Sequence, residues 1–147
     1  MRLCSACLLG VKCRWDGESK PNPQVIALSD SEQLIPVCAE QLGGLDTPRV
    51  PQEIQGMSGE KVLDGKCLVL NKDGTDVTRE FISGAQKVLK LAKEKNIKEA
   101  IMKQKSPSCG CGKTYDGTFT GTLIDGDGVT TALLKRNGIK VISEDDF

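Results

Sequence analysis

Apolar residues recur at helical spacing along one long segment, which predicts the clearest helix of the chain at residues 78–95. Asp76 or Thr78 is suited to cap its first turn, and Asn96 is suited to end it in a left-handed conformation. The apolar face of this helix consists of Phe81, Ile82, Ala85, Val88, Leu89 and Ala92.

The order of a helix followed by a short apolar strand occurs three times along the chain. This repetition is typical of a parallel sheet with right-handed crossovers. We therefore expect an α/β fold with a three-layer, mainly parallel, Rossmann-like sheet, in a single domain spanning residues 1–147. The predicted pairs are a weaker helix at 24–32 with a strand at 34–37, the helix at 78–95 with a strand at 99–103, and a helix at 128–136 with a strand at 139–142.

The stretches between these units are rich in glycine. Residues 42–65 and 115–126 are expected to form loops or short hairpins, and residues 62–70 are expected to form a hairpin of their own. Asn137 and Gly138 are expected to stop the helix at 128–136.

Composition narrows the classes of function. The 147 residues include 20 basic and 20 acidic side chains, so no overall positive field attracts nucleic acid. No apolar run approaches the ~20 residues that span a bilayer, and the amino terminus lacks a secretory signal core. We expect a cytosolic protein without a membrane partner, whose thiols stay reduced.

The seven cysteines carry the candidate chemistry, because the chain contains no histidine. Three of them follow strand-like runs: Cys7 follows residues 1–6, Cys38 follows 34–37, and Cys109 closes 101–108. If these runs are neighbouring parallel strands, the three thiols meet at the carboxyl edge of one sheet, where such sheets bind ligands. Thiolates without imidazole favour a soft metal centre, and iron–sulfur fits better than catalytic zinc.

The predicted surroundings of these cysteines point to a catalytic centre. Each lies just past a strand, where free backbone N–H groups are expected to lower the pKa of the thiol. Three protein ligands leave one metal position open, which is a mark of catalysis rather than of electron transfer.

Two other classes of function stay open at this point. The first is a non-enzymatic module in which zinc or a cluster cross-links the chain. The second is a dithiol redox protein that uses Cys4 with Cys7 or Cys109 with Cys111. Any of the cysteines can also be a small buried hydrophobe, and this is the favoured interpretation for Cys67.

An ordered series of motifs, covering nearly the whole chain, resembles the bacterial thiouracil and thiouridine desulfidase family. The match is specific to the family because so many motifs occur in the same order. The motifs are Ser5-Ala-Cys7-Leu-Leu-Gly10, Arg14-Trp-Asp-Gly17, Pro36-Val-Cys38-Ala-Glu40, Gly43-Gly-Leu45, Pro48-Arg49, Asp76-Val-Thr78, Ser106-Pro-Ser-Cys109-Gly110, Tyr115-Asp-Gly-Thr-Phe119 and Gly126-x-Gly-Val129.

This resemblance implies a [4Fe-4S] cluster held by Cys7, Cys38 and Cys109, with one open iron site. That iron would take the sulfur of a thiolated pyrimidine, water would replace the sulfur at carbon, and no net redox change would occur. Glu40 and Ser106 match the positions that handle water and protons. Ala39 stands where the family often has proline. As an alternative, Cys13 or Cys111 would close the open site as a fourth ligand.

Simpler roles compete for the other candidate residues. Glu40 can cap a helix start, Ser106 can shape a turn before Pro107, and Arg14 and Arg49 can be solvated rather than bind a phosphate or carboxylate. The expected partner is a small thiolated nucleobase or nucleoside, and tRNA is the less favoured substrate. The sequence gives no indication of the oligomeric state.

Overall fold

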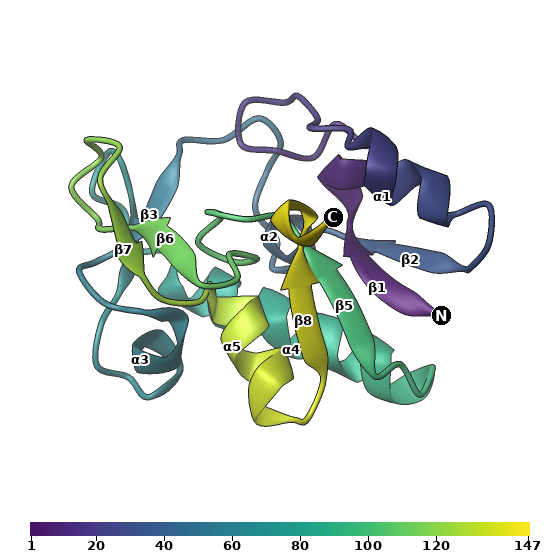
Figure 1. Ribbon diagram of the computed structural model, residues 1–147. Helices are drawn as coiled ribbons and strands as arrows, with labels where there is room; N and C mark the ends of the chain where they lie inside the picture. Colours follow the sequence, from purple (N-terminus) through teal and green to yellow (C-terminus); the bar gives the residue numbers. More distant parts are fainter.

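The computed structural model describes residues 1–147 and has a four-stranded parallel sheet at its centre. The strands lie in the order β2-β1-β5-β8, and all neighbours are parallel (Figure 1). This confirms the expected α/β class with a mainly parallel sheet. The strands are β1 (Arg2–Ser5), β2 (Leu34–Val37), β5 (Glu99–Met102) and β8 (Lys140–Ser143).

Alternate residues of the central strands face two separate cores, which gives the sheet helical elements on both sides. Leu3 packs with Val88 of α4 (Thr78–Glu94) and Leu134 of α5 (Val129–Arg136). The next residue, Cys4, packs with residues of η1 (Ala6–Leu9) and α1 (Pro23–Leu28). In Figure 1, α1 accordingly lies on the side of the sheet away from α4 and α5.

The two long helices match their sequence patterns. Asp76 Oδ1 accepts the Thr78 backbone N–H at 2.9 Å, and Asn96 adopts the expected left-handed conformation with φ 54°. Gly138, with φ 76°, follows α5. The apolar face of α4 is buried at Phe81, Ala85, Val88 and Ala92.

The first predicted helix is shorter than expected. It begins after Asn22, whose Oδ1 accepts the N–H groups of Gln24 and Val25 at 3.0 Å, and it ends at Leu28 rather than at residue 32. Beyond it, the Ser29 and Ser31 hydroxyls donate to the carbonyls of Ile26 and Leu28. Such local bonds compete with the helical backbone pattern and favour turns.

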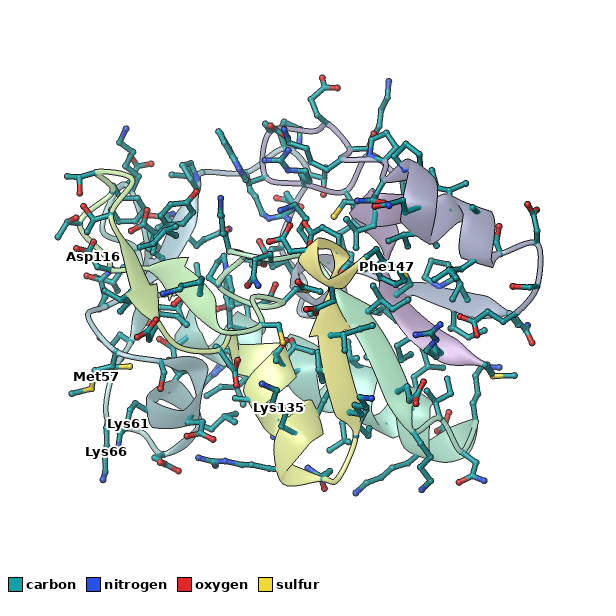
Figure 2. All side chains as sticks on the ribbon, viewed as in Figure 1. Met57, Lys61, Lys66, Asp116, Lys135 and Phe147 are labelled. Carbon is teal, nitrogen blue, oxygen red and sulfur yellow. The ribbon has the colours of Figure 1, made fainter.

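The prediction of a separate hairpin at residues 62–70 is wrong, because residues 62 and 63 belong to helix α3 (Gly59–Leu63). The strand that follows, β4 (Val69–Asn71), instead pairs in antiparallel fashion with β3 (Gln52–Ile54). Val62 and Val69 are both buried in a third core with Phe81. Lys61 and Lys66 extend into solvent at this edge of the molecule (Figure 2).

The stretch at 115–126 does contain the expected short hairpin. Strands β6 (Lys113–Tyr115) and β7 (Leu123–Asp125) pair in antiparallel fashion. The remaining elements are α2 (Ala39–Leu42) and η2 (Glu144–Asp146). None of the helices has the length and apolar character needed to cross a membrane.

Two glycines allow α2 to lie directly on the backbone of α4. A Cβ atom on Gly84 would come within 2.0 Å of the Ala39 carbonyl oxygen, and one on Gly43 would come within 2.0 Å of the Glu80 carbonyl oxygen. Because α2 starts immediately after Cys38 and carries Glu40, this close approach fixes the backbone from which both side chains extend.

Gly84→Ala should therefore destabilise the protein, although alanine is the better helix former by about 1 kcal/mol. The added methyl group meets backbone that cannot rotate away, so we expect the free energy of unfolding to fall by about 1–3 kcal/mol in chemical denaturation. Gln86→Ala, an exposed change on the same helix, is the control and should stay within about 0.5 kcal/mol. Wild-type stability of the Gly84 variant would show that the two helices are not in backbone contact.

Candidate functional site

A cavity of about 560 Å³ opens at the carboxyl ends of β1, β2 and β5. All five site residues expected from the sequence line it: Cys7, Cys38, Cys109, Glu40 and Ser106. Parallel strands bring their carboxyl ends to one edge of the sheet, which is why residues so distant in sequence meet there. The cavity therefore brings together the whole predicted constellation.

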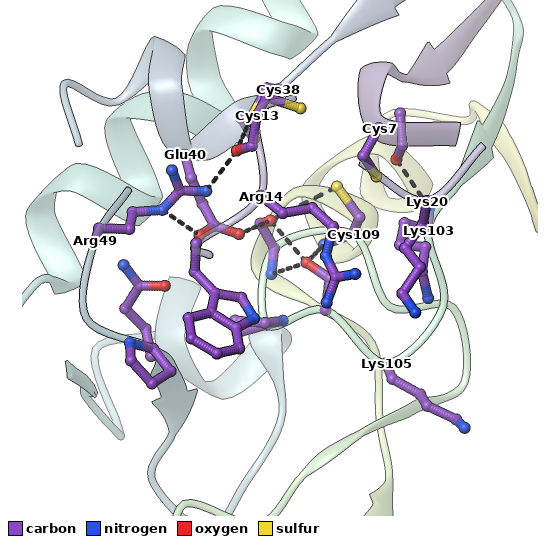
Figure 3. A pocket seen from close by; sticks show the side chains of 18 of the residues that line it. Cys7, Cys13, Arg14, Lys20, Cys38, Glu40, Arg49, Lys103, Lys105 and Cys109 are labelled. Carbon is purple, nitrogen blue, oxygen red and sulfur yellow. Dashed lines mark hydrogen bonds and ion pairs between the residues drawn. The ribbon is translucent and has the colours of Figure 1, made fainter. Parts of the chain in front are cut away.

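The three cysteines reach the cavity from three separate segments. Cys7 lies in η1, two residues beyond β1, and Cys38 is the residue between β2 and α2. Cys109 does not directly follow a strand as expected, because β5 ends at Met102 and residues 103–108 form a loop. Figure 3 shows the three side chains around a common space.

The other four cysteines differ in their access to this space. Cys13 is buried and lines the cavity, whereas Cys4, Cys67 and Cys111 do not line it. The Cys111 thiol donates to the Val141 carbonyl at 3.5 Å, and that of Cys67 donates to the Ser58 carbonyl at 3.8 Å. All seven are free thiols, and no three Cys, Asp or Glu side chains are grouped tightly enough to bind a single metal ion.

The expectation of lowered thiol pKa values is wrong for two of the three cysteines. Burial raises the pKa of Cys109 to about 12, although the Ser5 and Ser108 hydroxyls act in the opposite direction. The pKa of Cys38 is raised by its hydrogen bond with Cys13 and by burial, and a backbone bond from Gln41 opposes these effects. Binding of a metal to these thiols would therefore require them to lose protons.

Glu40 is held by two partners rather than serving as a helix cap. Its Oε1 accepts a hydrogen bond from Arg49 Nε at 3.0 Å, and its Oε2 accepts one from Ser108 Oγ at 2.9 Å. The Glu40 and Arg49 side chains are only 11% and 7% exposed, so Arg49 is not the solvated residue that composition favours. Arg14, in contrast, is a partly buried neighbour of Asp16, at 3.8 Å.

Ser106 shapes the turn before Cys109 and also belongs to the site. Its Oγ accepts the N–H groups of Ser108 and Cys109 at 3.2 and 3.1 Å. The same oxygen lies 3.0 Å from Ser108 Oγ. Ser108 is thus the link between Ser106 and Glu40 that the sequence analysis missed, and the only signal for it was its place next to Cys109.

The cavity concentrates positive charge in a chain of zero net charge. Its basic side chains outnumber its acidic ones by six to two, and this excess favours an anionic ligand or product. The basic residues are Arg14, Lys20, Arg49, Lys72, Lys103 and Lys105, and the acidic residues are Glu40 and Glu53.

These features define an α/β protein with a thiol-lined, positively charged site at the carboxyl edge of a parallel sheet. The chain belongs to the 2-thiouracil desulfurase family, whose model matches residues 3–146. It is 46% identical to the uncharacterized protein YbbK of Bacillus subtilis (strain 168), over all of this chain and 97% of that protein. A solved structure, of the [4Fe-4S]-dependent thiouracil desulfidase TudS, is similar with a TM-score of 0.87 and 42% identity, covering 99% of this chain and 91% of that one.

Arg49→Met should strongly destabilise the protein. It removes bonds to Glu40, to Thr47 and to the carbonyls of Asp46 and Cys13, and it leaves the Glu40 carboxylate buried without its counter-charge. We expect a loss of about 3–5 kcal/mol in the free energy of unfolding, measured by denaturant titration.

The matched control is Arg136→Met, which breaks the more exposed ion pair with Asp64 and should cost less than about 1 kcal/mol. Equal effects of the two substitutions would contradict a buried, coupled Arg49–Glu40 pair.

Proposed function

We propose that this protein is a [4Fe-4S]-dependent, non-redox desulfidase of thiolated pyrimidines, such as 2- or 4-thiouracil and thiouridine. The observation that carries the proposal is the convergence of Cys7, Cys38 and Cys109 on one cavity in a chain of this family. The overall reaction exchanges the sulfur of a thiocarbonyl for the oxygen of water and releases sulfide, so it needs no external electron donor.

The donor set suits an iron–sulfur cluster better than other metal centres. It consists of thiols without histidine, which is the usual ligation of such clusters. A cluster of four irons is itself wide, so its ligands need not be as close as those of a single ion. The Ser108 hydroxyl, 3.6 Å from Cys109 Sγ, can stabilise a ligand thiolate, and the basic side chains offset the negative charge of the centre.

A bound cluster with one iron free of protein ligands would supply a Lewis acid for the substrate sulfur. The chain itself supplies the groups that handle protons. Glu40 Oε2 accepts from Ser108 Oγ, which in turn lies within hydrogen-bond distance of Ser106 Oγ. We infer that Glu40 accepts a proton from the attacking water and that Ser106 and Ser108 connect the carboxylate to the substrate. Arg49 holds the carboxylate in place.

The cavity favours a small substrate. Its volume of about 560 Å³ lies within the ~300–1,000 Å³ range of small-molecule sites, enough for a base or a nucleoside. The excess of basic side chains suits an anionic group on the substrate and the sulfide product. A tRNA substrate is the less favoured alternative because the cavity has the volume of a small-molecule site.

Anaerobic reconstitution with iron and sulfide tests the cluster. We expect brown protein, with visible absorption and about four irons per chain, that releases sulfide from 2-thiouracil. Cys7→Ala, Cys38→Ala and Cys109→Ala should each lose iron and activity but keep the far-ultraviolet circular dichroism of the α/β core. The matched control is Cys67→Ala, a cysteine outside the cavity, which should keep both.

Two outcomes would contradict this proposal. Colourless protein that binds zinc in place of iron would favour a structural metal module, as would unfolding of all three cysteine variants. Cys13→Ala tests the alternative in which Cys13 is a fourth cluster ligand and no iron site is open. Loss of iron in this variant would support that alternative.

Ser108→Ala tests the proton route. We expect normal iron content and a kcat that falls about 10- to 100-fold, because Glu40 loses its only hydroxyl partner and its link to Ser106. Ser31→Ala, an exposed serine, is the control. A Ser108 variant with full cluster and wild-type kcat would remove Ser108 from the mechanism.

A further inference from the structure

The aromatic residues of this chain are concentrated at the cavity. The chain has only five, and Trp15, Tyr115 and Phe119 line the cavity, whereas Phe81 is in the core and Phe147 is the carboxyl-terminal residue. Trp15 is the only tryptophan, and 43% of it is exposed. A large apolar ring left open to a cavity points to a ligand with an apolar face.

Phe119 is held in a conformation that bulky residues avoid. Its φ is 57°, in the left-handed region, where non-glycine residues are uncommon and strained. Such strain persists only where the surrounding structure imposes it, and it tends to occur at functional sites. Phe119 therefore needs a structural feature that holds it at the cavity wall.

Glu53 of β3 provides that feature. Glu53 is only 9% exposed. Its Oε1 accepts the N–H groups of both Gly117 and Phe119, at 2.9 and 3.2 Å. Gly117 lies so close to β3 that a Cβ atom would be 2.8 Å from the Ile54 carbonyl oxygen. The Gly56 N–H donates to the Asp116 carbonyl at 2.9 Å. The loop that carries Phe119 is thus fixed to β3 through a buried carboxylate.

The loop that carries Trp15 is fixed to the catalytic side of the cavity. The Arg49 backbone N–H donates to the Trp15 carbonyl at 2.7 Å, and Asp16 Oδ1 accepts the Glu18 N–H at 3.0 Å. Arg49 also binds Glu40, so the backbone of Trp15 is tied to the residue that holds the proposed base. Two aromatic residues from distant parts of the sequence therefore line one cavity on backbone segments that are held in place.

We infer that Trp15 and Phe119 form the surface on which the pyrimidine ring of the substrate stacks, and that Glu53 is the positioning residue for Phe119. This inference rests on the proposed function and adds the residues that select a flat, aromatic thiocarbonyl compound. Stacking on an aromatic side chain requires only a π-face, so it accepts thiouracils that carry sulfur at different ring positions. Aliphatic thioamides lack such a face and are excluded.

Steady-state kinetics of the reconstituted holoprotein with 2-thiouracil test the stacking surface. Trp15→Ala and Phe119→Leu should each raise KM about 5- to 150-fold, which corresponds to stacking of about 1–3 kcal/mol per base. The kcat of each variant should change less than about threefold. Trp15→Phe should restore most of the affinity. Phe147→Leu changes an aromatic residue that does not line the cavity and should leave KM unchanged.

Glu53 has its own pair of variants. Glu53→Ala frees the loop and should raise KM in the same way as Phe119→Leu. Glu53→Gln keeps an acceptor oxygen for the two N–H groups and should retain a KM close to that of the wild type. If Glu53 had a purely structural role, both variants would lose stability and their KM values would not differ from each other.

A second measurement separates this inference from the proposed function. Uracil, the product of the reaction, should change the fluorescence of the single tryptophan of the holoprotein in a saturable way, and Phe119→Leu should weaken its binding. This binding of uracil is expected even if the protein releases no sulfide from 2-thiouracil. Uracil binding without sulfide release would overturn the proposed reaction but not the stacking surface. Wild-type KM values in both the Trp15→Ala and Phe119→Leu variants, together with no effect of uracil on fluorescence, would overturn the stacking surface.

Discussion

Parallel pairing of β1 with both β2 and β5 is the constraint on which the site depends. Ser5 is paired with Val37, and Cys4 is paired with Ile101, so the three strands end at one level. The chain after each strand then has to pass over the same edge of the sheet, and each of these segments carries a thiol. The three cysteines meet because of both features together, the aligned ends of the strands and the segments that follow them. A one-residue shift in the register of either pair would separate the thiols and would also move residues such as Leu3 and Cys4 out of their two cores, so the cores themselves hold the register that the site needs.

The Arg49–Glu40 pair adds a second constraint, because it connects segments that the sheet does not control. Arg49 donates to the carbonyls of Cys13 and Asp46 as well as to Glu40, and it thereby holds the loop after β1 against the start of α2. Burying a charged pair costs desolvation energy, and the protein offsets it by satisfying nearly every donor of the guanidinium group. The carboxylate gains a fixed orientation toward Ser108. Local stability and the orientation of the Glu40 carboxylate are therefore linked through one side chain.

The parts of this structure that follow from the sequence are those with a strong local period or an ordered motif. The face of α4 and its stop at Asn96 could be predicted because each depends on residues close in sequence. The cavity could be predicted because strand order in parallel sheets places cysteines at one edge. The helix α3 was missed because its five residues, Gly59–Leu63, are too short for a helical period to be visible. Ser108, Arg49 and Glu53 were missed in their present roles because their partners lie 9 to 68 residues away, and composition alone favours a solvated surface for such side chains.

The cavity is built from two parts of the fold, the segments that follow the strands of the parallel sheet and the β6–β7 hairpin. This division allows the thiol side of the cavity and its aromatic wall to be positioned separately. The thiols, Glu40 and the serines lie on segments that leave the parallel sheet, and their positions follow from its register. Phe119 instead lies on the β6–β7 hairpin, which is anchored through Glu53 to the small β3–β4 sheet. Changes in that hairpin alter the wall of the cavity without moving the strand ends. The shape of the cavity wall can thus change in evolution while the three cysteines and Glu40 stay where the parallel sheet puts them.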